Sequence, residues 1–301
     1  MSAHAKVILT LLIALLVSEG CIAPRANIQS GKVTPKGEIA VGYDLTVNVP
    51  FNTAKIASSQ VLSEYKSVVN QDDTPYERDR LTEYSRLTLA QALDPIGSSN
   101  QFYVRYGAID RLDLGLAYGS AGFIFDTALQ LLHSERHALD ASIGLQYSAQ
   151  NFELPSIAGD AQELLGFDFN RDDLLLRVTA SIPFGPSEQY GSFGFGAALN
   201  YTRLNYGFQP EDVGYDIGGD QIAYLSEVPS DAESFFAYGG FINIKVGYEY
   251  IYLVSSLNLY HQSYGTYTLP AEQTETFDGW TLVPSIGVTG RFAGPFKDTD
   301  D

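Results

Sequence analysis

The sequence predicts an all-β fold, a ten-stranded antiparallel up-and-down β-barrel. Three observations lead to this prediction. Ten segments alternate apolar and polar residues with a period of two, which is the period of side chains along a strand. The connections between these segments alternate between short and long. The 301-residue chain is 13% aromatic and contains 28 glycines, but only 18% of its residues are charged, below the roughly 25% of soluble domains.

The first of these segments shows the pattern clearly. From Ile39 to Val49 every second residue is apolar, and the residues between them are Ala, Gly, Asp, Thr and Asn. The other nine segments are 101–107, 112–118, 123–132, 139–148, 173–184, 192–206, 235–248, 251–264 and 280–292. Most approach the 9–11 residues that a tilted membrane strand needs. Pro284 has no N–H to donate, so we expect a missing ladder bond or a bulge there.

The composition of the polar face indicates which face of the barrel points outward. A soluble barrel would expose a face rich in Lys and Glu to water, but here that face consists mainly of Gly, Ser, Thr, Asn and Ala. The apolar face ends repeatedly in Tyr, Phe or Trp, as in the aromatic girdles of membrane barrels. We therefore expect a transmembrane β-barrel with its polar face inside. A soluble, lipid-anchored β-barrel binding protein is the alternative.

Charged residues of both signs fall on the predicted inner face. They are Asp44, Arg105, Asp113, Asp126, Asp140, Arg177, Lys245 and Arg291. A ten-stranded barrel has little room once its side chains are in place. The mixed signs therefore predict an ion-pair network that fills the lumen, and a polar path through it is the alternative.

The connections predict how the barrel is oriented. Short turns lie at 108–111, 133–137, 185–191 and 248–250. Long loops lie at 51–100, 149–172, 207–234 and 265–279, and only 119–122 is short on that side. Outer-membrane barrels have short periplasmic turns, long external loops and an even number of strands. We therefore expect both the N-terminus and the C-terminus in the periplasm.

The first 20 residues have the features of an export signal. Lys6 precedes an apolar run from Val7 to Val17, which is too short to span a membrane, and small residues follow. The single cysteine of the chain, Cys21, comes next. This arrangement resembles the bacterial lipobox, in which the cysteine is lipidated and becomes the new N-terminus. Gly20 fits the small residue of that motif, whereas Ser18 and Glu19 depart from it.

The resemblance to the lipobox implies a lipid on Cys21, and ordinary cleavage nearby is the alternative. Residues 22–37 are polar and contain Pro and Gly. We expect residues 21–37 to form a lipidated periplasmic tether between the membrane and the fold.

Over residues 38–292 the chain resembles bacterial outer-membrane β-barrel proteins, at the level of architecture. In that family the last strand ends in an aromatic residue that the barrel-assembly machinery reads. Phe292 fits this position, although an acidic C-terminal tail, 293–301, follows it. The resemblance implies a location in the outer membrane. Outer-membrane lipid, lipopolysaccharide and the assembly machinery are then the expected partners.

The segment 51–100 lacks the alternation and predicts two helices. Ser58, Leu62, Tyr65 and Val69 have helical spacing in the first helix, as do Leu81, Tyr84 and Thr88 in the second, which Pro95 would end. We expect a helical extracellular insert that forms a lid or plug at the outer mouth. A mobile surface loop is the alternative.

Charge and residue types limit the candidate functions. The 36 acidic residues against 18 basic ones argue against nucleic acid as a partner, because a phosphate backbone requires clustered Lys and Arg. The loops 207–234 and 265–279 carry acidic residues and no Lys or Arg. They lack the spacing of an EF-hand, so we expect no metal or cofactor site. Divalent cations bridging these loops to lipopolysaccharide are the preferred interpretation.

We expect a small non-enzymatic barrel that serves as a narrow channel, as a binder or transporter of small or hydrophobic ligands, or as a surface structural protein. The alternative is an outer-membrane hydrolase, a protease or a lipid-modifying enzyme. A hydrolase would need His close to Ser and a carboxylate. Only His133, in the sequence His133-Ser134-Glu135, and His261 offer such a start, and the sequence assigns no catalytic residue.

Overall fold

The computed structural model describes residues 25–58, 76–120, 122–150, 162–211, 213–218, 221–270 and 273–293. Ten of its strands form a closed barrel in which every neighbouring pair is antiparallel. The barrel strands are β1 (Glu38–Pro50), β3 (Gly97–Ile109), β4 (Leu112–Gly119), β5 (Gly122–Leu132), β6 (Asp140–Gln150), β7 (Phe167–Phe184), β8 (Gly191–Phe208), β11 (Val228–Tyr248), β12 (Ile251–Leu269) and β13 (Gln273–Ala293). Each of the ten predicted segments corresponds to one of them, so the predicted fold is confirmed.

Three predicted loops are partly wrong, because the strands continue through them. The sequence predicts loops at 149–172, 207–234 and 265–279, but β7 begins at Phe167, β11 begins at Val228, and β12 ends at Leu269 close before β13 begins at Gln273. In these extensions the apolar side chains face inward. Phe167 and Phe169 are buried in β7, whereas further along the strand the inward positions are Arg171 and Asp173. The alternation thus reverses its polarity, and this reversal hid the strand ends.

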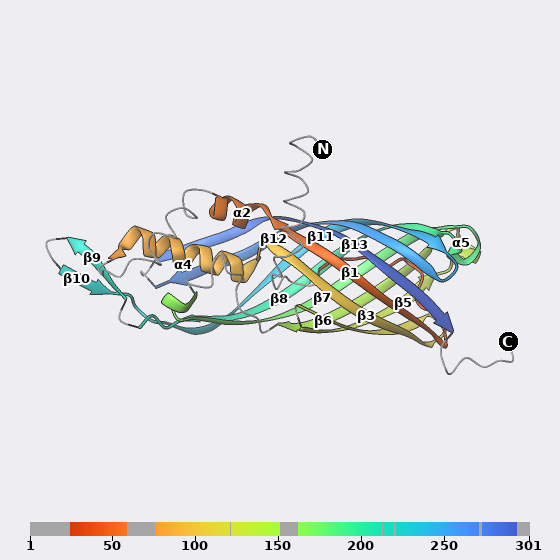
Figure 1. Cartoon of the computed structure of the whole chain (residues 1–301), viewed down its shortest axis with the longest axis horizontal. Coiled ribbons are helices and arrows are strands. Elements are labelled where there is room, and N and C mark those ends of the chain that lie inside the picture. The colour runs from red at the N-terminus through yellow and green to blue at the C-terminus, as the bar shows by residue number, and fades with distance from the viewer. Residues whose placement is uncertain are drawn as a thin grey trace, which may run out of the picture.

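Further elements lie at the two ends of the barrel. At one end are the helices α2 (Phe51–Ser58) and α4 (Arg78–Leu93) and a small sheet of β2 (Tyr76–Glu77), β9 (Gly214–Gly218) and β10 (Gln221–Tyr224). The short helix α5 (Ser134–His137) and the 3-10 turn η1 (Pro186–Glu188) lie in turns at the other end. Figure 1 shows α4, β9 and β10 beyond one end of the barrel and α5 at the opposite end. None of the helices in the described residues is both long and apolar enough to cross a membrane.

The outer wall of the barrel is apolar. Leu114, Leu116, Ile242 and Leu253 are each at least 47% exposed on it, and many other large apolar side chains share this wall. Aromatic pairs lie toward both ends, such as Tyr201 with Phe236, whose ring centroids are 5.1 Å apart, and Tyr190 with Tyr248 at 5.9 Å. An apolar band between two aromatic girdles is the outer surface of a transmembrane barrel.

The inner wall carries the predicted ion-pair network. Arg105 donates to both carboxylate oxygens of Asp113, at 3.1 and 2.5 Å, and to Asp126 at 2.6 Å. Arg177 donates to Asp126 at 2.8 Å. These four side chains are almost fully buried. The network contains four of the eight charged residues that the sequence places on the inner face, and it occupies one side of the lumen. Lys245 and Arg291 pair instead with Glu188 and Glu38, so the prediction of an ion-pair network is confirmed in part.

Pro284 interrupts the sheet where the sequence predicts it. Along β1 and β13 the register pairs Thr46 with Ser285 and then Val49 with Leu282. The residues between them lack a ladder partner in this pairing. Proline cannot donate a backbone hydrogen bond, which accounts for the break. The break lies between β1 and β13, the first and last strands of the barrel.

We expect Asp126→Ala to destabilise the barrel by about 3–5 kcal/mol, because it leaves Arg105 and Arg177 with uncompensated buried charge. Urea unfolding in lipid vesicles, followed by the fluorescence of the single Trp280, measures this change. Asp168→Asn, at an exposed position, serves as the control and should change stability by less than about 0.5 kcal/mol. A loss below about 1 kcal/mol in Asp126→Ala would show that the network does not hold the lumen together.

Candidate functional site in the barrel lumen

Residues 25–37 lie inside the barrel, and we call them the lumen segment. Arg25, Asn27, Ile28, Val33 and Thr34 are all at most 7% exposed. Residues 21–37 are predicted to form a lipidated periplasmic tether, and for the described residues 25–37 this prediction is wrong. Cys21, the predicted lipidation site, lies outside the described residues, as do the export signal and residues 294–301 of the tail.

Polar side chains of the wall hold the lumen segment along its whole length. Asn258 accepts a hydrogen bond from the backbone N–H of Asn27 at 2.9 Å. Asn243 donates to the carbonyl oxygen of Gln29 at 2.9 Å. Asp113 accepts from the N–H of Thr34 at 2.9 Å. An unpaired backbone group in a closed lumen would cost free energy, so these wall residues supply partners that water would otherwise provide.

Two glycines show how closely the lumen segment fits. A Cβ added at Gly31 would lie 2.3 Å from the carbonyl oxygen of Asp140. One added at Gly107 of β3 would lie 1.9 Å from the carbonyl oxygen of Pro35. The N–H of Gly31 also donates to Ser181 at 2.9 Å. Only glycine leaves room for backbone to approach backbone at these two positions.

Little free volume remains around the lumen segment. One cavity of about 30 Å³ lies between Asn27, Tyr103 and Arg177. Another of about 60 Å³ lies nearer the short-turn end, beside Thr34, Asp113 and Lys245. A water molecule needs at least about 10–15 Å³ measured in this way, so these cavities hold a few waters and no larger solute.

The carboxylate of Asp94, just after α4, joins the lumen segment, the helix and the wall. It accepts hydrogen bonds from Gln262 and Tyr264, both at 2.6 Å, and from Thr281. Asn48 of β1 donates to its other oxygen at 2.7 Å. The guanidinium of Arg25 lies 3.8 Å away and donates to Gln262 at 2.6 Å. Asp94 is fully buried, so this cluster fixes the start of the lumen segment and the end of α4 together.

A second buried pair anchors α4 to the wall. Arg171 is bidentate to Asp173, at 2.8 and 3.0 Å, and donates to the carbonyl oxygen of Leu93 at 2.7 Å. Leu93 is the last residue of α4, where the helix leaves carbonyl groups without intrahelical partners. A cation at a helix C-terminus also interacts favourably with the helix dipole.

An apolar core fills the end of the barrel beneath α4. We call α4, the strand ends around this core and the β2–β9–β10 sheet the outer module. Leu81, Tyr84 and Leu89 of α4 are buried against inward-facing aromatic side chains of the extended strands. Tyr206 and Tyr267 are among these, with ring centroids 5.3 Å apart, and burial raises the pKa of both hydroxyls. The second predicted helix is therefore present, and it is packed rather than part of a mobile loop. Residues 59–75, which include most of the first predicted helix, lie outside the described residues.

At the opposite end the lumen is lined by Glu188 and Lys245, whose charged groups are 2.7 Å apart. Burial acts to raise the pKa of Glu188, but the charge of Lys245 and the hydrogen bonds that the carboxylate accepts together outweigh it, and the net pKa is lowered. The ion pair joins the turn between β7 and β8, which carries Glu188, to Lys245 of β11.

The structure places the candidate catalytic histidines apart from the lumen. His133 lies in the turn before α5, where its Nδ1 is 3.3 Å from Gln130 and 3.9 Å from the carboxylate of Asp140. His261 lies on the outer wall between Tyr238 and Trp280, at ring-centroid distances of 5.3 and 4.9 Å. Its Nδ1 has no hydrogen-bond partner within the part of the chain that the structure describes. A general base is normally oriented by such a partner. The geometry therefore favours His261 as part of the aromatic girdle over His261 as a catalytic base.

The acidic residues of the outer module also stay dispersed. Within the described ranges no three His, Cys, Asp or Glu side chains converge as metal ligands. Glu275 instead pairs with Arg86 of α4 at 2.8 Å.

The closed wall, the apolar exterior and the polar interior define a transmembrane β-barrel with an occupied lumen. No family model matches the chain, and no curated protein matches it either. Solved structures similar to it are outer-membrane proteins. Ail of Yersinia pestis is 10% identical, with 85% of this chain and 99% of that chain covered and a TM-score of 0.30. A major outer-membrane protein of Thermus thermophilus is 8% identical, with 84% and 99% covered and a TM-score of 0.34.

OprG of Pseudomonas aeruginosa is 10% identical, with 88% of this chain and 100% of that chain covered and a TM-score of 0.31. These likenesses agree with the resemblance in architecture that the sequence suggests. At such identities and scores they carry no argument about the site, which rests on the contacts described above.

We expect Asp94→Ala to loosen α4, because the variant removes the acceptor that Gln262, Tyr264 and Thr281 share. Trypsin should then cleave after Arg86 at least about tenfold faster, since cleavage follows the population of the opened helix and about 1.4 kcal/mol changes it tenfold. Limited proteolysis of the purified protein, with mass spectrometry of the fragments, measures this rate. Glu83→Gln, on the exposed face of the same helix, is the control. Equal rates in the two variants would contradict the assigned role of Asp94.

Proposed function

We propose that this protein is a non-enzymatic outer-membrane β-barrel that is closed to diffusion and displays a rigid module at the cell surface. The single observation that carries the proposal is the filled lumen. The lumen segment is bonded to the wall from Asn27 to Thr34, and the cavities beside it hold about 30 and 60 Å³. A pore for nutrients needs a continuous water path, which this packing does not provide. Of the three roles that the sequence suggests, the surface role therefore fits best.

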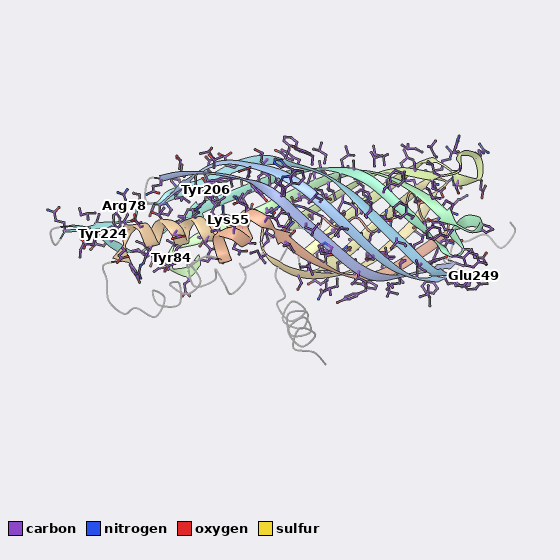
Figure 2. All side chains as sticks on the ribbon, turned by 90° about the horizontal axis from the view of Figure 1, so that it is seen from above. Lys55, Arg78, Tyr84, Tyr206, Tyr224 and Glu249 are labelled. Atoms are coloured by element: carbon purple, nitrogen blue, oxygen red, sulfur yellow. The ribbon has the colours of Figure 1, made fainter. Side chains whose placement is uncertain are left out.

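The outer module supports this surface role. Its apolar core beneath α4 gives it the packing of a small folded domain. The strand extensions, α4 and the β2–β9–β10 sheet project together beyond the barrel (Figure 2), on the side where Arg78, Tyr84 and Tyr224 lie. A rigid surface of this kind suits a structural or binding platform, because its groups are ordered before a partner arrives.

The same features support the proposed orientation and location. The strand ends joined by short turns are the periplasmic ends in outer-membrane barrels, which supports a periplasmic position for the C-terminal end of β13. The acidic side chains of the outer module then face the cell surface, where divalent cations can bridge them to lipopolysaccharide. The apolar wall supplies the contact with outer-membrane lipid.

We expect the full chain, reconstituted in planar lipid bilayers, to give no steady conductance steps, because ions lack a water path through the lumen. Measurement at several voltages in 1 M salt, on the order of ten times physiological ionic strength, makes small pores visible. Stable single-channel steps from the unmodified chain would overturn the closed-barrel proposal and restore the narrow channel.

We expect Gly31→Phe to open a conducting path. The added side chain must displace the lumen segment, because a Cβ at this position already meets the carbonyl oxygen of Asp140 at 2.3 Å. Gly240→Phe is the matched control, since Gly240 is exposed on the outer wall and an added Cβ there meets only an ordinary contact at 3.5 Å. Heat-modifiable migration on gels reports whether each barrel is folded. Folded Gly31→Phe without conductance would show that another part of the lumen maintains the seal.

A further inference from the structure

The β2–β9–β10 sheet, which we call the tip sheet, is packed against the protein on one face only. On the packed face Tyr215 of β9 lies against the apolar core of the outer module, and the guanidinium of Arg78 lies 5.8 Å from the centre of its ring. On the other face Ile222 and Tyr224 of β10 are 52% and 63% exposed. A Cβ added at Gly214 would lie 2.8 Å from the side chain of Ile222 and 3.6 Å from that of Tyr224, so both lie over this glycine. The exposed face thus presents an aliphatic and an aromatic side chain next to each other.

The strand β10 forms the edge of the tip sheet, and β9 is its only neighbouring strand in the part of the chain that the structure describes. The N–H of Leu225 donates to the carbonyl oxygen of Val213 at 3.0 Å, so these two residues form a hydrogen-bonded pair. Bonded and non-bonded pairs alternate along an antiparallel ladder. The next bonded position is therefore Ala223, whereas Ile222 and Tyr224 direct their backbone groups away from β9. The two residues with exposed side chains are also the ones with outward N–H and C=O groups.

The sequence of β10 lacks the residues that usually protect such an edge. Natural sheets keep their edge strands from pairing by placing Lys, Pro or an inward charge on them, or by covering them. β10 reads Gln221-Ile222-Ala223-Tyr224 and contains none of these residues. An edge of this kind can accept an extended segment as an additional strand, in which main-chain hydrogen bonds give affinity and neighbouring side chains give specificity.

We propose that the β10 edge is a docking site for an extended, basic segment of a partner protein, which adds to the tip sheet as a further strand. This inference rests on the proposed function and deepens it, because it names the site and the class of partner of the surface module. The partner segment pairs its backbone with Ile222 and Tyr224 and places apolar side chains beside theirs on the exposed face.

The charge around the tip sheet indicates that the partner segment is basic. Glu211, Asp216 and Glu227 are exposed beside β9 and β10, and the segment 207–234 contains no Lys or Arg. Asp216 is the direct cross-strand neighbour of Ile222. A Lys or Arg on the added strand would therefore meet opposite charge, which selects this class of partner and speeds its association.

Two other occupants of the edge fit less well. A second copy of the chain would bring the acidic residues of two tip sheets together, and like charges across an interface oppose association. The bilayer is distant, because the 16 residues of α4 cover about 24 Å between the barrel end and β2 of the tip sheet. Figure 1 shows β9 and β10 beyond the far end of α4, and Figure 2 shows Tyr224 at the opposite end of the molecule from Glu249.

Fluorescence anisotropy of a labelled peptide, titrated with the purified full chain in detergent, tests the site. The probe is a peptide of alternating valine and lysine with a typical strand length of about six residues. We expect it to bind at least about tenfold more tightly than a peptide of alternating valine and glutamate. Methylation of every second backbone nitrogen of the probe should abolish binding on one of the two possible registers, because it removes the donors that pair with β10.

Variants of the chain test the parts of the site separately. Tyr224→Ser should weaken binding of the valine–lysine peptide at least about tenfold, as the loss of an aromatic anchor does. Tyr250→Ser is the matched control, since Tyr250 is 61% exposed but lies in the turn between β11 and β12. Glu227→Gln should weaken binding about two- to threefold at low salt, whereas Glu135→Gln, exposed in α5, should not. Ile222→Pro removes one outward N–H, which an edge strand tolerates, and should abolish binding.

Heat-modifiable migration on gels shows that each variant is folded. Binding that depends on Tyr224, on Ile222 and on the lysines of the probe supports the docking site. Absence of binding to the unmodified chain, or equal affinities of Tyr224→Ser and Tyr250→Ser, overturns it. A dimer in analytical ultracentrifugation that Ile222→Pro dissociates would assign the edge to a second copy and overturn it as well.

The same probe separates this inference from the proposed function. Added to intact cells that produce the full chain, the peptide should label them, and cells that produce Tyr224→Ser should stay dark. Binding to the purified chain without labelling of intact cells would refute display at the cell surface and leave the docking site standing. A chain that conducts in planar bilayers and still binds the peptide would refute the closed barrel alone.

Discussion

The structure depends on one constraint: the polar face of a membrane barrel must find its hydrogen-bond partners inside. In lipid the apolar side chains have to point outward, which turns every polar strand residue toward a narrow lumen. Some of these residues satisfy one another, as Arg105 and Arg177 do with Asp113 and Asp126. The neutral ones, among them Asn243 and Asn258, instead bind the backbone of the lumen segment. The segment therefore completes the inner wall as much as it blocks the passage.

The strands could be predicted because a membrane barrel imposes alternation on each of them separately. Ile39 to Val49, for example, carries its full signal in eleven residues, with no need to know its neighbours. The prediction of the ion-pair network succeeded in part for the same reason, since the face of each charged residue follows from its place in the alternation. The helix 78–93 was found because Leu81, Tyr84 and Thr88 share one helical face.

The lumen segment could not be predicted in this way. Its residues have no periodicity, and a polar stretch with Pro and Gly also describes a solvated tether. Its partners lie far away in the chain: Asn258 is 231 residues from Asn27, and Ser181 is 150 residues from Gly31. One feature of the sequence is consistent with a filled lumen: the inner face carries many neutral hydrogen-bonding residues, such as Asn243 and Asn258, and these need partners inside the barrel. The reversed polarity of β7 was hidden similarly, because Phe167 and Phe169 face inward only where α4 replaces lipid and water with a core.

The helix α4 and the lumen segment are held by the same buried contacts, so they do not close the barrel independently. Asp94 at the end of α4 receives hydrogen bonds from β1, β12 and β13, while Arg25 approaches the same carboxylate from the lumen. Withdrawal of the lumen segment would remove the nearest cation from a fully buried carboxylate, and such a carboxylate is costly without a partner. Movement of α4 would likewise expose the carbonyl of Leu93 and remove one hydrogen-bond acceptor from the buried guanidinium of Arg171. The free energy of opening either seal therefore includes contacts that the other seal shares.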